Sequence, residues 1–398
     1  MTIPPTTHAI DIDKARRETP GCAHVVHLNN AGAALTPQPV LDAYFDHLNL
    51  EARIGGYEAA REAHDAAEHT YDAVARLLGC RHDEVALIEN ATRAWDMAFY
   101  AFAFQPGDRI LTAKAAYASN YIAFLHVARR TGAAIEVIEN DEHGQVSVER
   151  LRDALDERVK LLALTHVPTN GGLVNPAAAV GRVAQEAGIP FLLDACQSTG
   201  QMPLDVDALG ADILSGTSRK FLRGPRGVGF LYVRHTLLDR IDPPLLDLHA
   251  ASWTHPDRYE IRDDARRFET WEANIAARIT FGTAVDYALT WGLEAIWQRI
   301  QHLAEVLRAR LRTLPGVTVH DLGRIRCGIA TFSAASLEAE AIRDKLRQQG
   351  INVWITTPSA TLLDSTARGL PTMVRASVHY YNTEDEVERL CTALRSLL

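Results

Sequence analysis

The sequence lacks several features that would assign it to a common class of protein. No run of apolar residues among its 398 positions is long enough for a membrane span, and a formal net charge of −9 leaves no basic face for nucleic acid. Its five cysteines are widely spread and form no Cys-x-x-Cys pair, so neither a disulfide framework nor a metal site is predicted. The first residues lack a charged region followed by an apolar core, so we expect no secretory signal and a cytoplasmic location.

Apolar runs alternate with amphipathic stretches through most of the chain. The runs predicted as strands are 85–88, 109–112, 135–138, 161–164, 191–193 and 213–215. Helical stretches such as 93–104, 120–131 and 176–187 lie between them. Strands joined in this way by helices are typical of a mainly parallel sheet covered on both faces, so an α/β fold is predicted.

The length of the chain predicts more than one domain, because 398 residues exceed the size at which one hydrophobic core stops growing. A long helical region from about 284 to 313 leads into a second group of elements. These are strand-like runs at 317–319 and 328–332 and helical stretches at 336–349 and 383–398. We therefore predict an N-terminal arm (1–55) with one helical stretch at 39–50, a large ligand-binding domain (56–285) and a small α+β domain (286–398).

Two residues, Lys220 and Asp194, carry the chemistry predicted for the large domain. Lys220 lies among Arg and Gly residues 26 positions after Asp194, which directly follows an apolar strand. A lysine can hold pyridoxal phosphate as a Schiff base, and a carboxylate at a strand end can keep the pyridine nitrogen protonated, so that the ring becomes an electron sink. Either residue alone is weak evidence, because such a lysine is usually solvated and such an aspartate often only caps a helix. Together they predict a pyridoxal 5'-phosphate site.

Other polar residues also follow predicted strands. Asn90, Ala91 and Thr92 stand between the first strand and a helix, where free backbone N–H groups can cradle a phosphate. Tyr117 follows the second strand and Gln197 follows the fifth. Because open α/β sheets bind ligands beyond the carboxyl ends of their strands, we expect these residues to meet at one site.

Several motifs resemble those of one known family. They are Asp-Ala-Cys-Gln at 194–197, Ser-Arg-Lys-Phe-Leu-Arg-Gly-Pro-Arg-Gly at 218–227, and Arg-Ala-Ser at 375–377 ahead of Tyr-Asn-Thr at 381–383. On these motifs the chain resembles the class V aminotransferase superfamily of fold-type I pyridoxal phosphate enzymes over nearly its whole length. The resemblance implies a seven-stranded type of sheet, a smaller C-terminal α+β domain and a homodimer.

The resemblance also implies roles at the cofactor. Lys220 would form the Schiff base and move the proton at the substrate α-carbon, while Asp194 would pair with the pyridinium nitrogen. Gln197 would donate to the phenolic oxygen of the cofactor, and Tyr117 would stack on its ring. The residues implied for the phosphate are Asn90, Ala91, Thr92, Thr217 and Arg219.

A second set of residues is implied for an amino acid substrate. Arg375 would bind the α-carboxylate, because its planar fork of donors matches a carboxylate. Asn30 and Ala31 lie in a turn of small residues that resembles the family's substrate-side turn. Thr169 or Asn170 would face the cofactor or the substrate, and the sequence leaves open which of the two does so.

Two departures from the family pattern bear on the reaction. Tyr117 stands where the desulfurase branch places a histidine, and the stretch 351–374 has no cysteine to take sulfur as a persulfide. We therefore predict a lyase that cleaves a carbon–sulfur bond of a cysteine-derived substrate by β-elimination. The alternatives are an epimerase (racemase) or an aminotransferase on the same scaffold and, less favoured, a cysteine desulfurase or a non-catalytic cofactor-binding protein.

A third departure concerns the homodimer that the resemblance implies. Family members commonly complete the phosphate site with a Gly-Thr-Pro-Asn segment of the partner subunit. This chain has Thr-Trp-Glu-Ala-Asn at 270–274 instead, which leaves that contact open.

Overall fold

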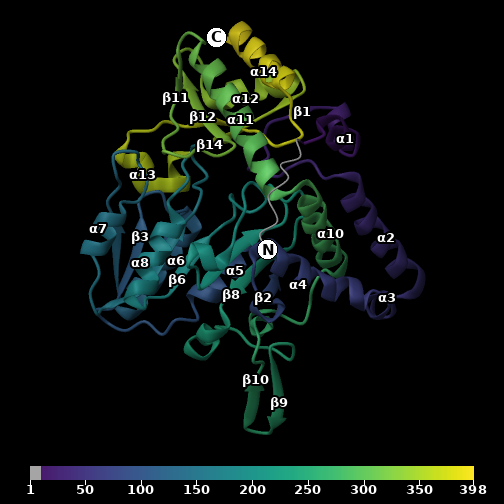
Figure 1. Cartoon of the computed structure of the whole chain (residues 1–398), viewed down its shortest axis with the longest axis vertical. Coiled ribbons are helices and arrows are strands. Elements are labelled where there is room, and N and C mark those ends of the chain that lie inside the picture. The colour runs from purple at the N-terminus through teal and green to yellow at the C-terminus, as the bar shows by residue number, and fades with distance from the viewer. Residues whose placement is uncertain (1–9) are drawn as a thin grey trace, which may run out of the picture.

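A seven-stranded sheet forms the centre of the computed structural model, which describes residues 10–398 (Figure 1). The strands lie in the order β2-β8-β7-β6-β5-β3-β4. Their bounds are β2 (Val85–Ile88), β3 (Arg109–Ala113), β4 (Ala134–Ile138), β5 (Val159–Thr165), β6 (Phe191–Asp194), β7 (Ile213–Thr217) and β8 (Gly229–Val233). Neighbouring strands are parallel except at β8, which is antiparallel to both β2 and β7. The predicted α/β fold with a mainly parallel sheet is confirmed, and β8 is a strand that the sequence analysis missed.

Helices cover both faces of this sheet because its strands are apolar on both sides. Along β2, Val85 and Leu87 enter one apolar cluster, whereas Ala86 and Ile88 enter another. The first cluster takes in side chains of α4, α8 and α10, and the second takes in those of α5 and α6. The bounds are α4 (His64–Leu78), α5 (Ala91–Phe99), α6 (Ala118–Thr131), α7 (Val148–Asp153), α8 (Ala177–Ala187), α9 (Val206–Leu209) and α10 (Ile275–Trp291). The helix predicted at 93–104 is wrong at both ends, since α5 starts earlier and stops at Phe99.

A second, smaller sheet lies at one end of the molecule, where it packs with three helices (Figure 1). It is antiparallel, in the order β11-β12-β15-β14. The elements are α11 (Leu293–Arg312), β11 (Val317–Val319), β12 (Ile329–Ala334), α12 (Ala339–Gln348), β14 (Trp354–Thr356), α13 (Leu362–Ala367), β15 (Met373–Ser377) and α14 (Glu384–Leu397). This α+β unit is the one the sequence predicts. The long helical region expected from about 284 to 313 is helical with one break, because Gly292, with a φ of 79°, separates α10 from α11.

The N-terminal residues pack across both sheets. Strand β1 (Val26–His27) pairs in parallel with β13 (Ile351–Asn352), beside the smaller sheet. The predicted helix at 39–50 lies within α2 (Gln38–Ile54), which packs against α10. The remaining elements here are α1 (Ile12–Arg17) and α3 (Gly56–Glu62). No helix among residues 10–398 combines the length and the apolar character needed to cross a membrane.

A two-stranded hairpin projects from the far end of the large sheet (Figure 1). It consists of β9 (Ala251–His255) and β10 (Arg258–Ile261), which the sequence analysis did not predict. Its side chains are mostly exposed, including Trp253 at 81% and Tyr259 at 61%. Short 3-10 helices complete the structure: η1 (Pro20–Ala23), η2 (His82–Glu84), η3 (His235–Arg240), η4 (Ala265–Phe268) and η5 (Pro358–Thr361).

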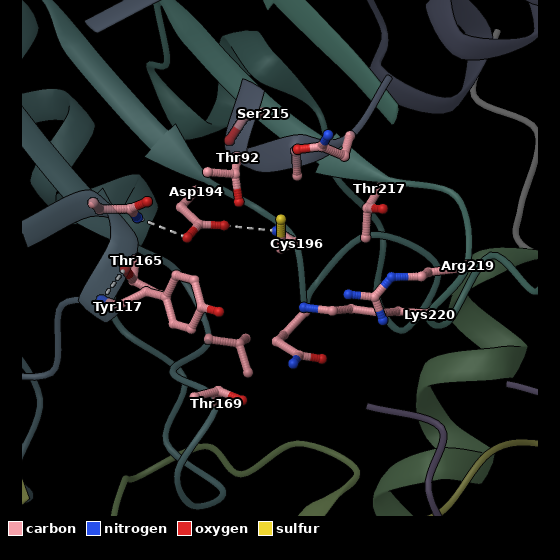
Figure 2. Close-up of a pocket in the computed structure, with 15 residues that line it drawn as sticks. Thr92, Tyr117, Thr165, Thr169, Asp194, Cys196, Ser215, Thr217, Arg219 and Lys220 are labelled. Atoms are coloured by element: carbon pink, nitrogen blue, oxygen red, sulfur yellow. Dashed lines mark hydrogen bonds between the residues drawn. The ribbon is translucent and has the colours of Figure 1, made fainter. Parts of the chain in front are cut away.

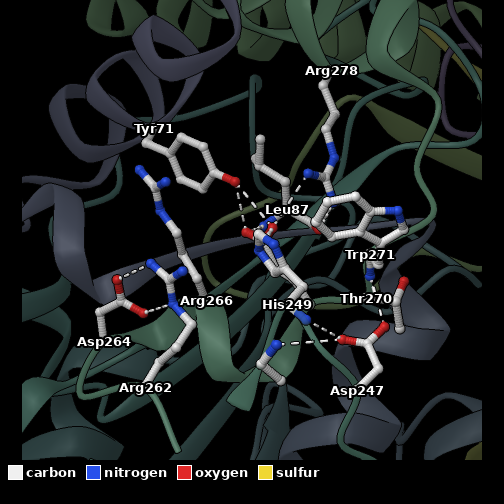
Figure 3. A network of polar contacts seen from close by, with 12 residues as sticks. Tyr71, Leu87, Asp247, His249, Arg262, Asp264, Arg266, Thr270, Trp271 and Arg278 are labelled. Carbon is white, nitrogen blue, oxygen red and sulfur yellow. Dashed lines mark hydrogen bonds and ion pairs between the residues drawn. The ribbon is translucent and has the colours of Figure 1, made fainter. Parts of the chain in front are cut away.

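A buried polar network holds β2 against its neighbours. Glu269 has a fully buried carboxylate, which accepts hydrogen bonds from Tyr71 Oη and from the backbone N–H of Leu87, both at 2.8 Å. Arg278 of α10 pairs with the same carboxylate at 3.3 Å and also donates to the Leu87 carbonyl. Figure 3 shows Tyr71, Leu87 and Arg278 converging on this point. The network fixes the strand that leads directly to Asn90.

Candidate active site

A cavity lies at the carboxyl ends of the parallel strands, where the sequence predicts the site. Figure 2 shows its lining side chains pointing into a common space from β5, β6 and β7 and from the helix starts beside them. The predicted residues that line it are Asn90, Ala91, Thr92, Tyr117, Thr169, Asp194, Gln197, Thr217, Arg219 and Lys220. The structure thus gathers most of the predicted residues at one place.

Asp194 ends β6 inside this cavity and is held in a fixed orientation. Asn120 Nδ2 donates to one of its carboxylate oxygens at 2.8 Å, and the backbone N–H of Cys196 donates to the other at 3.0 Å. Lys220 projects into the same cavity from the loop after β7 (Figure 2). Burial, with help from the neighbouring Arg219, lowers the pKa of Lys220. A lowered pKa favours the neutral amine, which is the nucleophilic form of lysine.

The start of α5 forms an anion-binding end of the cavity. Asn90 caps this helix, its Oδ1 accepting from the Arg93 N–H at 2.9 Å, so the residues after it present free N–H groups. Gly229 on β8 lets the strand pass close by, because a Cβ there would lie 3.2 Å from the Ala91 nitrogen. Arg219, whose guanidinium donates to the Gly32 carbonyl, adds a positive charge to the same cavity. Thr92 does not cap the helix, so its hydroxyl can face the cavity (Figure 2).

Tyr117 lines the cavity, whereas Arg375 is not among the lining residues but contacts one of them, Thr169. Tyr117 lies just before α6, and its ring is one wall of the cavity (Figure 2). Arg375, on β15 of the smaller sheet, donates to Thr169 Oγ1 at 2.5 Å, and its Nε has no partner among the described residues. Burial lowers the pKa of this guanidinium to about 10, which leaves it charged at neutral pH. A buried cation with an unused donor is suited to an incoming carboxylate.

The structure separates Thr169 from Asn170. Thr169 lines the cavity beside Arg375, whereas the Asn170 side chain points away from it. The Asn170 amide donates to the Thr357 carbonyl at 3.2 Å and to Thr361 Oγ1 at 2.9 Å. The hydrogen bonds of Asn170 therefore hold the segment that follows β14 in place.

Asn30 and Ala31 are not part of the cavity lining, in contrast to their expected substrate role. Asn30 is fully buried, and its amide donates to the Ser377 carbonyl at 2.7 Å and accepts from Tyr381 Oη. The Ala31 carbonyl accepts a hydrogen bond from Gln197 Nε2 at 3.1 Å. The polar groups of Asn30 and Ala31 already form hydrogen bonds within the protein. These two residues therefore stabilise the backbone and side chains next to the cavity.

The polar groups that line the cavity fit a pyridine cofactor with a phosphate. Gln197 Oε1 and Ser215 Oγ are buried at the cavity wall without a partner among residues 10–398. Buried polar atoms are normally hydrogen-bonded, so these two are suited to a bound molecule. The sequence analysis missed Ser215, Asn120 and Cys196 as lining residues. No group of three or more His, Cys, Asp or Glu side chains in the described range could hold a metal ion.

Comparisons with known proteins agree with this geometry. The family model described as aminotransferase class-V matches residues 26–390. A probable cysteine desulfurase of Methanothermobacter thermautotrophicus is 28% identical over 395 residues, covering 97% of this chain and 98% of that protein. The apo structure of a cysteine desulfurase from Thermococcus onnurineus superposes with a TM-score of 0.90 at 26% identity, covering 100% of this chain and 98% of the other.

A second similar structure supports the fold alone. C-DES, solved with glycine covalently linked to its pyridoxal-phosphate cofactor, has a TM-score of 0.85 at 22% identity over 96% of this chain and 98% of its own.

The predicted preference for a β-eliminating lyase is contradicted. The relatives that match nearly the whole chain are named cysteine desulfurases, the activity that the sequence analysis placed lower.

Proposed function

Because the chain belongs to the class V aminotransferase family, whose cofactor is pyridoxal 5'-phosphate, we propose that it is an enzyme that removes sulfur from L-cysteine. The observation that carries the proposal is the match to cysteine desulfurases over nearly the full length of both chains. The cavity supports it, because a lysine, an aspartate and an anion-binding helix start line it, and the buried Arg375 contacts Thr169 of the lining.

The residues that would hold the cofactor follow from the donors in the cavity. Lys220 is the amine that would link to it, and Asp194, oriented by Asn120, would pair with its ring nitrogen. The N–H groups at the start of α5, together with Thr92, Thr217 and Arg219, would hold its phosphate. When bound, pyridoxal phosphate supplies an electron sink for the bonds at the substrate α-carbon.

The remaining residues act on the substrate. Arg375 exchanges its contact with Thr169 for the α-carboxylate of cysteine, which orients the amino acid in the cavity. Lys220, whose pKa is lowered by burial, would take up and return the proton at the α-carbon. Tyr117 forms an aromatic wall that excludes water from one side.

The sulfur acceptor in this proposal is a thiol supplied from outside the chain. Burial raises the pKa of Cys327 and of Cys391 to about 11, and it also raises that of Cys196 in the cavity wall. Such thiols are poor nucleophiles at neutral pH. The external thiol RSH attacks the substrate sulfur and leaves as RSSH. The carbon–sulfur bond breaks, and a proton takes the place of sulfur on the β-carbon, which gives alanine.

A homodimer in the cytoplasm is part of the proposal. Exposed aromatic side chains of Trp253, Tyr259 and Trp271 lie on and beside the projecting hairpin, and such apolar patches usually mark interaction surfaces. The five free cysteines fit a reducing compartment.

Product analysis tests the function. Purified protein loaded with pyridoxal phosphate is incubated with L-cysteine and dithiothreitol, and alanine, sulfide, pyruvate and ammonia are quantified. We expect alanine and sulfide in equal amounts, and no turnover by a Lys220→Ala control. Pyruvate and ammonia in place of alanine would show elimination and would overturn the proposal.

A further inference from the structure

The turn that carries Lys220 is closed and tightly packed. The backbone N–H of Arg223 donates to the carbonyl of Lys220 at 3.0 Å, and Phe221, Leu222 and Arg223 are at most 2% exposed. Gly200 lies so close behind the turn that a Cβ on it would be 2.5 Å from the carbonyl carbon of Phe221. The backbone next to Lys220 therefore has little room to move.

Arg223 is held in this turn by contacts from distant parts of the chain. Its φ of 63° is the one left-handed value of a non-glycine residue among residues 10–398, and this conformation costs about 1 kcal/mol or more. The guanidinium forms no ion pair in the described structure. It donates instead to the Leu35 carbonyl at 2.9 Å, to Tyr380 Oη at 2.6 Å and to Thr19 Oγ1, and it lies 4.4 Å from the centre of the Tyr381 ring. Because a buried cation without compensation is unstable, these contacts keep Arg223 in place.

His379 holds the same turn from the other side. The Tyr380 N–H donates to its Nδ1 at 2.8 Å, so its Nε2 carries the proton and donates to the carbonyl of Phe221 at 2.9 Å. Burial, together with the nearby Arg223, lowers the pKa of this imidazole well below its usual value. The neutral ring thus uses both nitrogens, one as acceptor and one as donor.

We infer that Arg223 and His379 are positioning residues, which fix the turn 220–223 and so aim the amine of Lys220 into the cavity. Neither residue lines the cavity, and each contacts backbone or side chains within three positions of Lys220. The inference rests on the proposed role of Lys220.

Four variants test this inference. His379→Gln keeps a donor and an acceptor, whereas His379→Leu removes both. Arg223→Lys keeps the positive charge but loses the planar array of guanidinium donors. Arg223→Gly removes the side chain, and glycine readily adopts the left-handed backbone conformation at this position. Two readouts are used: amide hydrogen exchange of residues 219–224 in cofactor-free protein, and the pH midpoint of the visible absorption band of the loaded protein.

We expect His379→Leu and Arg223→Gly to raise exchange at least about tenfold, the equivalent of about 1.4 kcal/mol in local stability, and to shift the spectral midpoint. Exchange and spectral midpoint of His379→Gln should stay near the wild-type values. Those of Arg223→Lys should lie between the wild type and Arg223→Gly. The control is Arg308→Lys, at a fully buried arginine paired with Asp321 at 2.6 Å, which should lower the melting temperature and change neither readout.

If the variants at Arg223 and His379 lower the melting temperature as Arg308→Lys does, but leave exchange and midpoint unchanged, both residues are merely structural and the inference is wrong. The proposed function fails in a different way. A wild-type visible band that borohydride does not fix onto Lys220 would refute the role of that lysine, while exchange in the cofactor-free protein would still report on the turn.

Discussion

At the scale of single residues, Lys220 differs from a solvated lysine because burial lowers its pKa. Its amine therefore loses its proton at a lower pH than the ordinary value of 10.5. In cofactor-free protein, we expect acylation of Lys220 by a neutral reagent to reach half its maximal rate at a pH below 10.5. Competitive labelling with peptide mass spectrometry measures this midpoint. A midpoint at or above that of free lysine would contradict the expected environment.

Asp194 is expected to act through its charge. In Asp194→Asn the amide can keep the hydrogen bond to the Cys196 N–H, but it cannot hold a protonated ring nitrogen. We expect the variant to bind the cofactor and to lose about a hundredfold or more in kcat, which is roughly 2.7 kcal/mol or more in barrier. Bound cofactor is quantified by absorbance alongside the rate. Near-normal turnover with full occupancy would remove Asp194 from the mechanism.

Arg375 is expected to act on substrate binding. Arg375→Ala removes the buried guanidinium next to Thr169, so kcat/KM should fall by about a hundredfold or more, mainly through KM. The exposed Arg310, which pairs with Glu388 at 3.4 Å, gives a control variant Arg310→Ala with unchanged kinetics. An effect on kcat alone would argue against a carboxylate contact.

Single residues also show the limits of sequence patterns. Lys220 and Asp194 could be found because each follows a predicted strand, and parallel strands end at the same edge. No local pattern indicates that the amide of Asn30 is bonded to the carbonyl of Ser377, 347 positions away. Ser215 is an inward-facing residue of a buried strand, so no local signal distinguishes it from core.

At the scale of elements, strand β2 depends on one carboxylate. Glu269→Gln should lower the free energy of unfolding by about 3 kcal/mol, because it leaves Arg278 without its buried counter-charge. The exposed Glu272 gives a matched control, and Glu272→Gln should change stability by about 0.5 kcal/mol at most. Denaturant midpoints measure both. Equal effects of the two variants would mean that the network does not stabilise β2.

Strand β8 and hairpin β9–β10, which the sequence analysis did not predict, were missed for different reasons. Strand β8 is an apolar run that carries no signal of its direction, and it is antiparallel because the loop holding Lys220 returns the chain beside β7. Hairpin β9–β10 has mostly exposed side chains, so its hydrophobic pattern is weak. The apolar runs of β5 and β6 were recognised as strands, whereas that of β8, which is buried throughout, was not.

At the scale of the whole molecule, the exposed hairpin predicts association. Trp253→Ser combined with Tyr259→Ser removes two large exposed aromatic side chains without touching the cavity. We expect the double variant to sediment as a monomer under conditions in which the wild type is a dimer. Analytical ultracentrifugation measures this, and an unchanged dimer would exclude the hairpin from the interface.

The division of the chain into 1–55, 56–285 and 286–398 stays a prediction. Six strands of the large sheet and two of the small one follow from local periodicity, although β8, β14 and β15 were not predicted. The pairing of the N-terminal strand β1 with β13, which comes much later in the chain, does not follow from local patterns.

The contacts around the Lys220 turn also set an order of events during synthesis. Phe221 is bonded to a histidine 158 positions further along the chain, and Arg223 to a threonine 204 positions earlier. A ribosome therefore releases Lys220 long before the last residues that hold its turn. The nascent chain can build much of the large sheet first, but we expect its lysine to reach a fixed orientation only after residue 379 has been made and has folded against the turn.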